Sequence, residues 1–176
     1  ERIGLPIISD EVFADFPFTP GVCPPSRVTC VAREEGRALR VSMSGLSKLC
    51  GLPQMKLGWM ILAGNEWRAA MHRLELIADT YLSVNTPVQQ ALPALLESRI
   101  QPEILERVRA NRMLLPGALE ADGGWCAVVR VPQIHTEEEW VLRFIEEQDV
   151  IVQPGYFYDF ESEAYLIVSL LCRPDH

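Results

Sequence analysis

The sequence predicts an α/β fold in its first part and an α+β arrangement in its second. Residues 57–63 are a nearly continuous apolar run of strand length, which is typical of a strand covered on both faces. From Asn65 the apolar residues recur with a helical period, and after Gly124 strand-like and helix-like segments alternate.

Three short strands are expected in the first part. Ile7–Phe13 begins as an apolar strand and contains the acidic pair Asp10 and Glu11, and Leu39–Met43 and Leu57–Ala63 are the other two strands. The long connection between the first two strands is rich in residues that prevent regular structure, and Val28–Ala32 is its candidate strand. These residues are Pro17, Pro20, Gly21, Pro24 and Pro25.

Lys48 lies on a small, glycine-bearing turn between the second and third strands. In open α/β sheets ligands bind at strand ends, and a lysine amine that is partly shielded from water there is usable as a nucleophile. The alternative is a solvated loop lysine, which the spacing alone favours.

Three helices are expected next. Asn65 is a candidate N-cap for a helix to about Leu82, and Thr86, with Pro87 and Gln89, predicts a capping box for a second helix to about Ser98. Pro102 opens a third helix. The first helix is expected to bury Trp67, Met71, Leu74, Ala78 and Tyr81; the third is expected to bury Ile104, Val108, Leu115 and Leu119 and to expose Glu106, Arg107, Arg109 and Arg112.

The last part reads as a small sheet with one helix. Trp125–Val131 is strand-like, and Thr136 to Glu139 is a capping box for a helix that buries Trp140, Phe144 and Ile145. Val150–Val152 and Tyr165–Leu171 are the remaining strands.

Two ordered motifs resemble a known family. Ser47–Lys48, a second cation eight residues later at Lys56, and Leu57–Trp59 resemble the cofactor-lysine motif of the class I/II aminotransferases, the pyridoxal-phosphate enzymes of fold type I. Ile7–Phe13 resembles the family's strand that ends in Asp-Glu-Val-Tyr. The resemblance continues through Asn85–Gln90, Asp122–Trp125 and Val150–Gly155.

The resemblance implies how the chain is organised. Residues 1–64 correspond to the last strands of the large, cofactor-binding domain, and residues 65–176 correspond to an inter-domain helix and the α+β small domain. In the family a phosphate loop and a ring-stacking aromatic residue precede the Asp-Glu-Val strand. The chain is therefore expected to be the C-terminal part of a longer enzyme and to be inactive by itself.

The same resemblance implies the site residues. Lys48 holds the pyridoxal phosphate and carries the substrate proton, and Asp10 is the carboxylate beside the cofactor's ring nitrogen. Ser44 and Ser47 are candidate phosphate donors, although loop serines are more often turn formers, and a strand-end aspartate is more often a cap. Tyr156, Phe157 and Tyr158 either line a substrate pocket or pack the small domain.

The sequence departs from the family pattern in four places. Phe13 stands where the family usually has a tyrosine that bonds the cofactor, and Gly45 stands where it usually has a hydroxyl. Lys56 replaces the phosphate-binding arginine, which keeps the charge but loses the two-pronged geometry. Ile167 stands where the family has the arginine that binds the substrate's α-carboxylate.

Composition is consistent with such an enzyme. A hydrophobic content of 48% supports a buried core, and a net charge of −8 without a basic cluster argues against a nucleic-acid surface. There is no membrane-length apolar run, no metal-ligand spacing of histidines, and the five cysteines fit free thiols in the cytoplasm.

We therefore expect a cytoplasmic, homodimeric aminotransferase that acts on amino acids and 2-oxo acids. A lyase or decarboxylase of the same fold is the alternative enzyme, because fold alone does not fix the reaction. The alternative from another class is the non-catalytic effector-binding half of an aminotransferase-like transcriptional regulator.

Overall fold

A computed structural model describes residues 4–19, 30–97 and 100–173. The chain folds into two compact units: Glu1–Asp15 with Gly21–Pro102, and Phe16–Pro20 with Glu103–His176. The compact units therefore change near Pro102 rather than after residue 64, and the helices between these positions belong to the first unit. The assignment of residues 1–64 to a cofactor domain stays a prediction.

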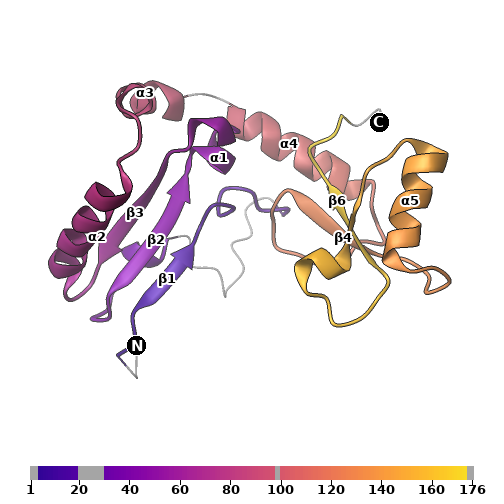
Figure 1. The fold of residues 1–176 in the computed structure, drawn as a ribbon, viewed down its shortest axis with the longest axis horizontal. Helices are drawn as coiled ribbons and strands as arrows, with labels where there is room; N and C mark the ends of the chain where they lie inside the picture. The colour runs from indigo at the N-terminus through magenta and orange to yellow at the C-terminus, as the bar shows by residue number, and fades with distance from the viewer. Residues whose placement is uncertain (1–3, 20–29, 98–99, 174–176) are drawn as a thin grey trace. The chain divides into compact units, whose positions relative to one another are not determined.

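The first unit contains a three-stranded sheet of β1 (Ile7–Asp10), β2 (Arg40–Gly45) and β3 (Gly58–Ala63), in that order (Figure 1). β1 and β2 run parallel, whereas β2 and β3 are antiparallel. The three expected strands are thereby confirmed. Within the described residues β3 pairs with β2 alone and exposes Met60 and Ile61, so the expected burial on both faces is not found there.

The helices of the first unit are α1 (Leu46–Leu49), α2 (Trp67–Tyr81) and α3 (Thr86–Leu96), with short 3-10 turns at Val31–Arg33 and Pro53–Met55. The 3-10 turn at Val31–Arg33 replaces the end of the strand expected at 28–32, and residues 28–29 lie outside the described part of the chain. The other expected breaker positions at 20, 21, 24 and 25 also lie outside it.

Both expected helix starts were placed one residue away from the true cap. Glu66 precedes α2 with a left-handed backbone (φ 62°), and α3 is capped by the Asn85 side chain, which accepts a hydrogen bond from Val88 N at 3.1 Å. Asn85 is a better N-cap than Thr86 because its amide oxygen reaches the first turn while Pro87 occupies a position that needs no N–H donor.

The expected inward face of α2 is also wrong. Leu74 is half-buried, whereas Trp67, Met71, Ala78 and Tyr81 are exposed. In contrast, α3 packs Val88, Leu92 and Leu95 against a buried cluster formed by Leu46, Cys50 and Leu57. The core of the first unit therefore lies beneath α1 and α3.

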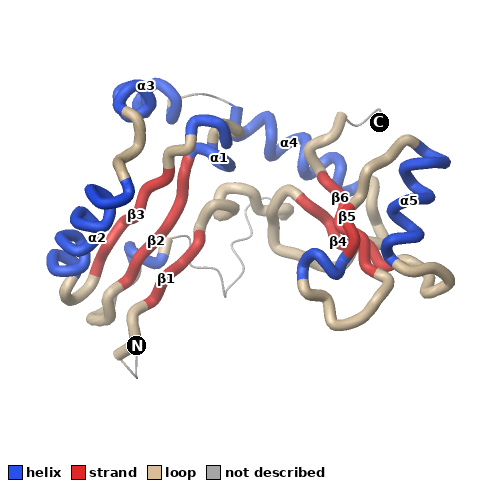
Figure 2. The backbone as a smooth tube through the Cα atoms, viewed as in Figure 1, coloured by secondary structure: helices blue, strands red, loops and turns tan. Residues whose placement is uncertain are grey.

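The second unit contains an antiparallel sheet in the order β4 (Cys126–Arg130), β6 (Tyr165–Ser169), β5 (Gln153–Pro154). Its helix α5 (Glu137–Gln148) lies beside this sheet (Figure 2), and the turn η3 (Gly155–Tyr158) links β5 to the segment before β6. The capping box of α5 is confirmed, with Glu139 N donating to Thr136 Oγ1 at 3.2 Å.

The strand expected at 150–152 is wrong. Asp149 has a left-handed backbone, and the N–H groups of Asp149 and Val150 bond back to carbonyls of the last turn of α5. These residues terminate the helix, and strand pairing begins only at Gln153, which lies opposite Ile167.

Helix α4 (Ile100–Met113) begins before Pro102, where its start was expected, and its arginines are not simply solvated. Arg109 Nε donates to Pro17 O at 2.9 Å, and Arg112 donates to the carbonyls of Leu115, Ala118 and Leu119. These bonds attach the segment around Pro17 and the turn after α4 to the helix. Leu119, expected to be inward, is exposed.

The core of the second unit is built on Val108, Ala127 and Leu170. The buried Phe16 contacts Trp125 edge to face, with ring centroids 5.3 Å apart. The buried Asn111 donates to Leu170 O at 2.9 Å and to Cys172 O at 2.8 Å. In α5, where all three were expected to be buried, Trp140 and Phe144 are half-buried and Ile145 is exposed.

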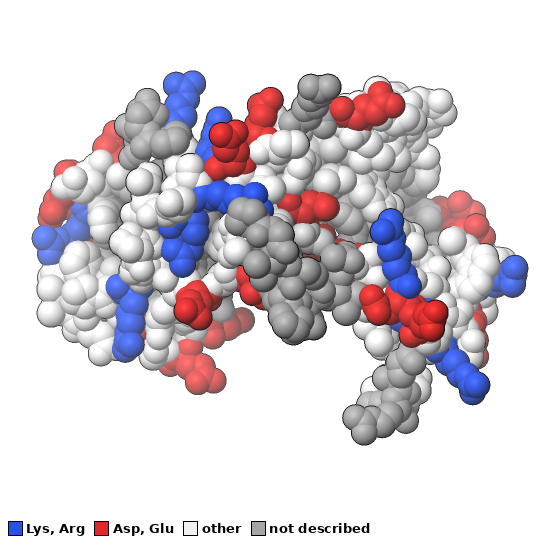
Figure 3. Space-filling view, turned by 180° about the vertical axis from the view of Figure 1, so that it is seen from behind, with Lys and Arg blue, Asp and Glu red and all other residues white. Residues whose placement is uncertain are grey.

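The surface carries both signs of charge. On the face shown in Figure 3, lysine and arginine side chains are interspersed with aspartate and glutamate rather than gathered into one basic patch. Among the described residues, no helix is long and apolar enough to span a membrane, and Cys30, Cys50 and Cys172 are free thiols.

Candidate active site

The predicted site residues of the first unit gather at one end of its sheet. Because β1 and β2 are parallel and Asp10 lies opposite Met43, both strands end at the same edge. β3 starts there too, since Gly45 lies opposite Gly58. Residues 10–13, 44–48 and 56 therefore belong to one end of the sheet, which is the kind of place where α/β proteins bind ligands.

The buried face of α1 positions Lys48 at this end of the sheet. Leu46 is fully buried beside Cys50 and Leu57, and Leu46 N donates to Leu57 O at 3.0 Å. Cys50 Sγ donates to Leu95 O at 3.4 Å, which links the turn to α3. With Leu46 turned inward, Ser47 and Lys48 are half-buried on the same short helix.

Gly45 permits this turn. A Cβ atom at Gly45 would lie 2.8 Å from Leu57 O and 3.0 Å from Gly58 Cα, both of them backbone positions. The backbone of Gly45 is extended (φ 178°), so the requirement is for space rather than for an unusual conformation. A side chain with a hydroxyl, which the resemblance led us to expect at this position, would therefore meet the backbone of Leu57 and Gly58.

Phe13 and Lys48 are in contact. Lys48 Nζ lies 5.3 Å from the centroid of the Phe13 ring, and both side chains are half-buried. A cation above an aromatic face is attracted by the ring quadrupole. The residue that departs from the family's tyrosine therefore still lies against the candidate cofactor lysine.

Asp10 is exposed at the end of β1, and its Oδ1 accepts a hydrogen bond from Val12 N at 3.1 Å. This is the turn-forming role that strand-end aspartates often have. This hydrogen bond uses one carboxylate oxygen of Asp10. The side chain lies at the same end of the sheet as Lys48.

Glu11 has a role that the sequence did not reveal. Its Oε1 accepts from Val31 N at 2.7 Å and from Ser42 Oγ at 2.8 Å, and Ser42 Oγ accepts from Ala32 N at 3.0 Å. The pair attaches the 3-10 turn at Val31–Arg33 to the sheet. The only sequence signal was its place beside Asp10.

The remaining candidate site residues are Ser44, Lys56, Tyr156 and Phe157. Ser44 is half-buried in β2 opposite Trp59, and Lys56 is exposed with a left-handed backbone (φ 51°) just before β3. Tyr156 and Phe157 belong to the second unit, where they are 52% and 66% exposed. They contact each other edge to face, with centroids 4.9 Å apart, and so do not pack the small domain's core.

The chemistry of this group of donors fits pyridoxal phosphate. A half-buried amine suits the cofactor's aldehyde, a carboxylate suits its ring nitrogen, and a cation with two hydroxyls suits its phosphate. One end of the sheet supplies all of these groups, from Lys48, Asp10, Lys56, Ser44 and Ser47.

Comparisons with known proteins find aminotransferases. The chain is 25% identical over 193 residues to mouse tyrosine aminotransferase, covering 97% of this chain and 41% of that protein. It is 24% identical over 160 residues to the glutamate-pyruvate aminotransferase AlaA of Haemophilus influenzae, covering 75% of this chain and 38% of that protein. The chain thus spans less than half the length of these curated relatives. No protein-family model matches it.

Solved structures show the same fold. An aminotransferase from Escherichia coli aligns with a TM-score of 0.78 at 22% identity, covering 99% of this chain and 46% of that one. Alanine aminotransferase from Pyrococcus furiosus aligns with a TM-score of 0.77 at 19% identity, covering 97% and 46%. In sequence and in fold, this chain is homologous to part of the class I/II aminotransferases of fold type I.

Proposed function

We propose that this chain is the C-terminal part of a pyridoxal-phosphate-dependent aminotransferase that moves an amino group between an amino acid and a 2-oxo acid. The observation that carries the proposal is the shared end of β1 and β2, where Phe13 lies against the half-buried Lys48 and Asp10 ends the neighbouring strand. The homology to aminotransferases supports it. The complete protein is proposed to be a cytoplasmic homodimer.

Each residue has a chemical task in this proposal. When bound, pyridoxal phosphate withdraws electrons from the bonds of the amino acid's α-carbon. Lys48 Nζ holds the cofactor and carries a proton to and from that carbon. Asp10 supplies negative charge at the ring nitrogen, and Lys56 supplies positive charge at the phosphate, with Ser44 and Ser47 as hydroxyl donors.

Phe13 contributes differently from a tyrosine. Its ring gives the Lys48 amine an apolar wall that excludes water on one side and attracts the protonated form. It has no hydroxyl to donate to the cofactor. The cofactor's phenolic oxygen is therefore expected to lack the hydrogen bond that the family's tyrosine supplies.

The substrate carboxylate must be bound elsewhere than at Ile167. Ile167 is 5% exposed in β6, the central strand of its sheet, between Val128 and Gln153. An apolar side chain there completes the core of the second unit. We therefore propose that another cation of the complete protein binds the α-carboxylate.

The cofactor lysine is tested by covalent trapping. The natural polypeptide that carries this chain is saturated with pyridoxal phosphate, reduced with borohydride and mapped by peptide mass spectrometry. The chain contains only two lysines, Lys48 and Lys56, so the map gives a direct choice between them. Label on Lys48, and its loss in Lys48→Arg, is expected; label on Lys56, or on neither, contradicts the assignment.

The reaction is tested with the same protein. Amino transfer is expected to convert an added 2-oxo acid into its amino acid in proportion to the donor consumed. Release of ammonia or carbon dioxide instead would identify a lyase or decarboxylase. Cofactor trapped on Lys48 without any turnover would identify the effector-binding half of a regulator.

A further inference from the structure

We infer that Glu137 is a positioning residue that fixes the Tyr156–Phe157 turn from inside the second unit. Glu137 is a charged residue that is only 2% exposed. Burying a carboxylate is costly unless hydrogen bonds replace its lost water. The hydrogen bonds that its carboxylate accepts therefore indicate the structural role of Glu137.

The two oxygens of Glu137 bind two separate segments. Oε2 accepts from Tyr156 N at 2.8 Å, and Oε1 accepts from Tyr165 N at 2.8 Å. The first amide lies in η3 and the second begins β6. One carboxylate thus joins the start of α5, the turn η3 and the start of β6.

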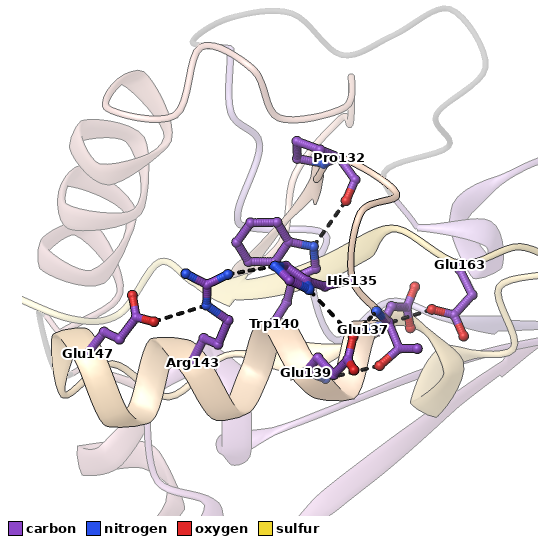
Figure 4. A network of polar contacts seen from close by, with 9 residues as sticks. Pro132, His135, Glu137, Glu139, Trp140, Arg143, Glu147 and Glu163 are labelled. Atoms are coloured by element: carbon purple, nitrogen blue, oxygen red, sulfur yellow. Dashed lines mark hydrogen bonds and ion pairs between the residues drawn. The ribbon is translucent and has the colours of Figure 1, made fainter.

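Both side-chain oxygens of Glu137 accept hydrogen bonds from backbone N–H groups. Glu137 is the first residue of α5, where the helix dipole and unpaired N–H groups attract anions. Its own N–H donates to Glu163 Oε2 at 3.0 Å, and Figure 4 shows both carboxylates at the start of the helix. The position is therefore set by backbone groups, which are fixed by the fold.

The same close contact with Glu137 requires a glycine at position 155. A Cβ atom at Gly155 would lie 2.7 Å from Glu137 Oε1 and 2.9 Å from Tyr165 Cβ. Pro154 and Gly155 are both buried. The carboxylate thus holds the turn so closely that no side chain fits between them.

The turn presents an aromatic pair to the outside. Tyr156 and Phe157 are mostly exposed, while the Tyr156 amide is tied to Glu137. Side chains on a fixed backbone lose less entropy when they bind a ligand. This inference rests on the proposed function: where the Tyr156–Phe157 pair contacts the substrate, Glu137 sets the affinity for substrate without touching it.

The test compares Glu137→Gln with Glu138→Gln, a matched change at the neighbouring exposed glutamate. The glutamine removes one acceptor and points an N–H₂ group at an amide donor. Hydrogen exchange at the Tyr156 and Tyr165 amides is measured in both variants. Exchange is expected to accelerate about tenfold or more in Glu137→Gln and to stay unchanged in Glu138→Gln.

Steady-state kinetics of the natural polypeptide supplies the functional measurement. Glu137→Gln is expected to raise KM for the amino acid by roughly fivefold while kcat changes by less than about twofold, because the reacting groups are untouched. If this variant does not fold, Gly155→Ala, which displaces the turn from the carboxylate, is expected to give the same exchange and KM changes.

The outcomes separate this inference from the proposed function. Unchanged exchange at Tyr156 and Tyr165 overturns the role of Glu137. Faster exchange with unchanged KM also overturns it as a positioning residue, because the turn would then be purely structural. A wild-type protein without turnover refutes the proposed function and with it the positioning role, whereas the exchange measurement still shows whether Glu137 fixes the turn.

Discussion

Replacing Gly45 by serine restores the hydroxyl that the resembling family usually has three residues before its lysine, yet we expect it to damage this protein. The added Cβ would lie 2.8 Å from Leu57 O and 3.0 Å from Gly58 Cα. Real Cβ atoms do not approach backbone that closely, so β3 must move by several tenths of an ångström. Overpacking of this kind costs roughly 1–3 kcal/mol.

The displacement also reaches the site, because Leu46 N bonds to the same Leu57 O and Lys48 lies in the same short helix as Leu46. We measure unfolding of the first unit by hydrogen exchange of its β2 amides in increasing denaturant. Gly117→Ala, followed in the same way through the β4 amides of the second unit, is the control, since nothing lies within 4 Å of its added Cβ. It is expected to change stability by less than about 1 kcal/mol.

Two results would refute this reasoning. Gly45→Ser with unchanged stability would show that the strands can separate at no cost. Increased trapping of pyridoxal phosphate on Lys48 would show that the family hydroxyl fits after all. We expect reduced trapping instead.

Three further predictions test individual contacts. Lys56→Met is expected to weaken pyridoxal-phosphate affinity by roughly 1–2 kcal/mol while Lys56→Arg keeps it, as measured by cofactor titration; equal affinity in both variants would show that Lys56 only faces solvent. Phe13→Leu removes a cation–π contact of about 0.5–1 kcal/mol, so reductive methylation of Lys48 should accelerate about two- to fivefold relative to Lys56, whereas Phe13→Tyr should leave it unchanged. Asn111→Ala leaves two carbonyl acceptors without their donor and should lower the free energy of unfolding of the second unit by roughly 1–3 kcal/mol in a denaturant titration. In the same titration Asn65→Ala, which changes an exposed asparagine, should have little effect.

The strands could be predicted from the sequence, because apolar runs of strand length indicated β1, β2 and β3. Asp10 and Lys48 were expected together only from the family resemblance, and the parallel pairing of β1 with β2 places both at one end of the sheet. The strand prediction succeeded because hydrophobic pattern is a local property. The capping box at Thr136 was found for the same reason.

Features that depend on tertiary contacts could not be predicted. Arg109 and Arg112 were expected to face solvent. Arg109 instead binds the carbonyl of Pro17, which is distant in sequence, and Arg112 binds the carbonyl of Leu115 in the turn after the helix. The apolar face of α2 looked buried but is exposed among the described residues. A helical period shows that a face is apolar, and it does not show whether another element covers it.

The structure also bears on the alternatives that the sequence left open for Lys48 and Asp10. A solvated loop lysine would be exposed, whereas Lys48 is half-buried and its amine lies against the Phe13 ring. Asp10 does form the turn expected of an ordinary strand-end aspartate, but that bond uses one oxygen of a carboxylate that can accept several. The capping role and the cofactor role are therefore compatible, and Asp10→Asn separates them: it keeps the oxygen that accepts from Val12 and removes the negative charge. If Asp10 only forms the turn, this variant should trap cofactor on Lys48 and turn over like the wild type. If Asp10 supports the ring nitrogen, the fold should be retained while turnover falls.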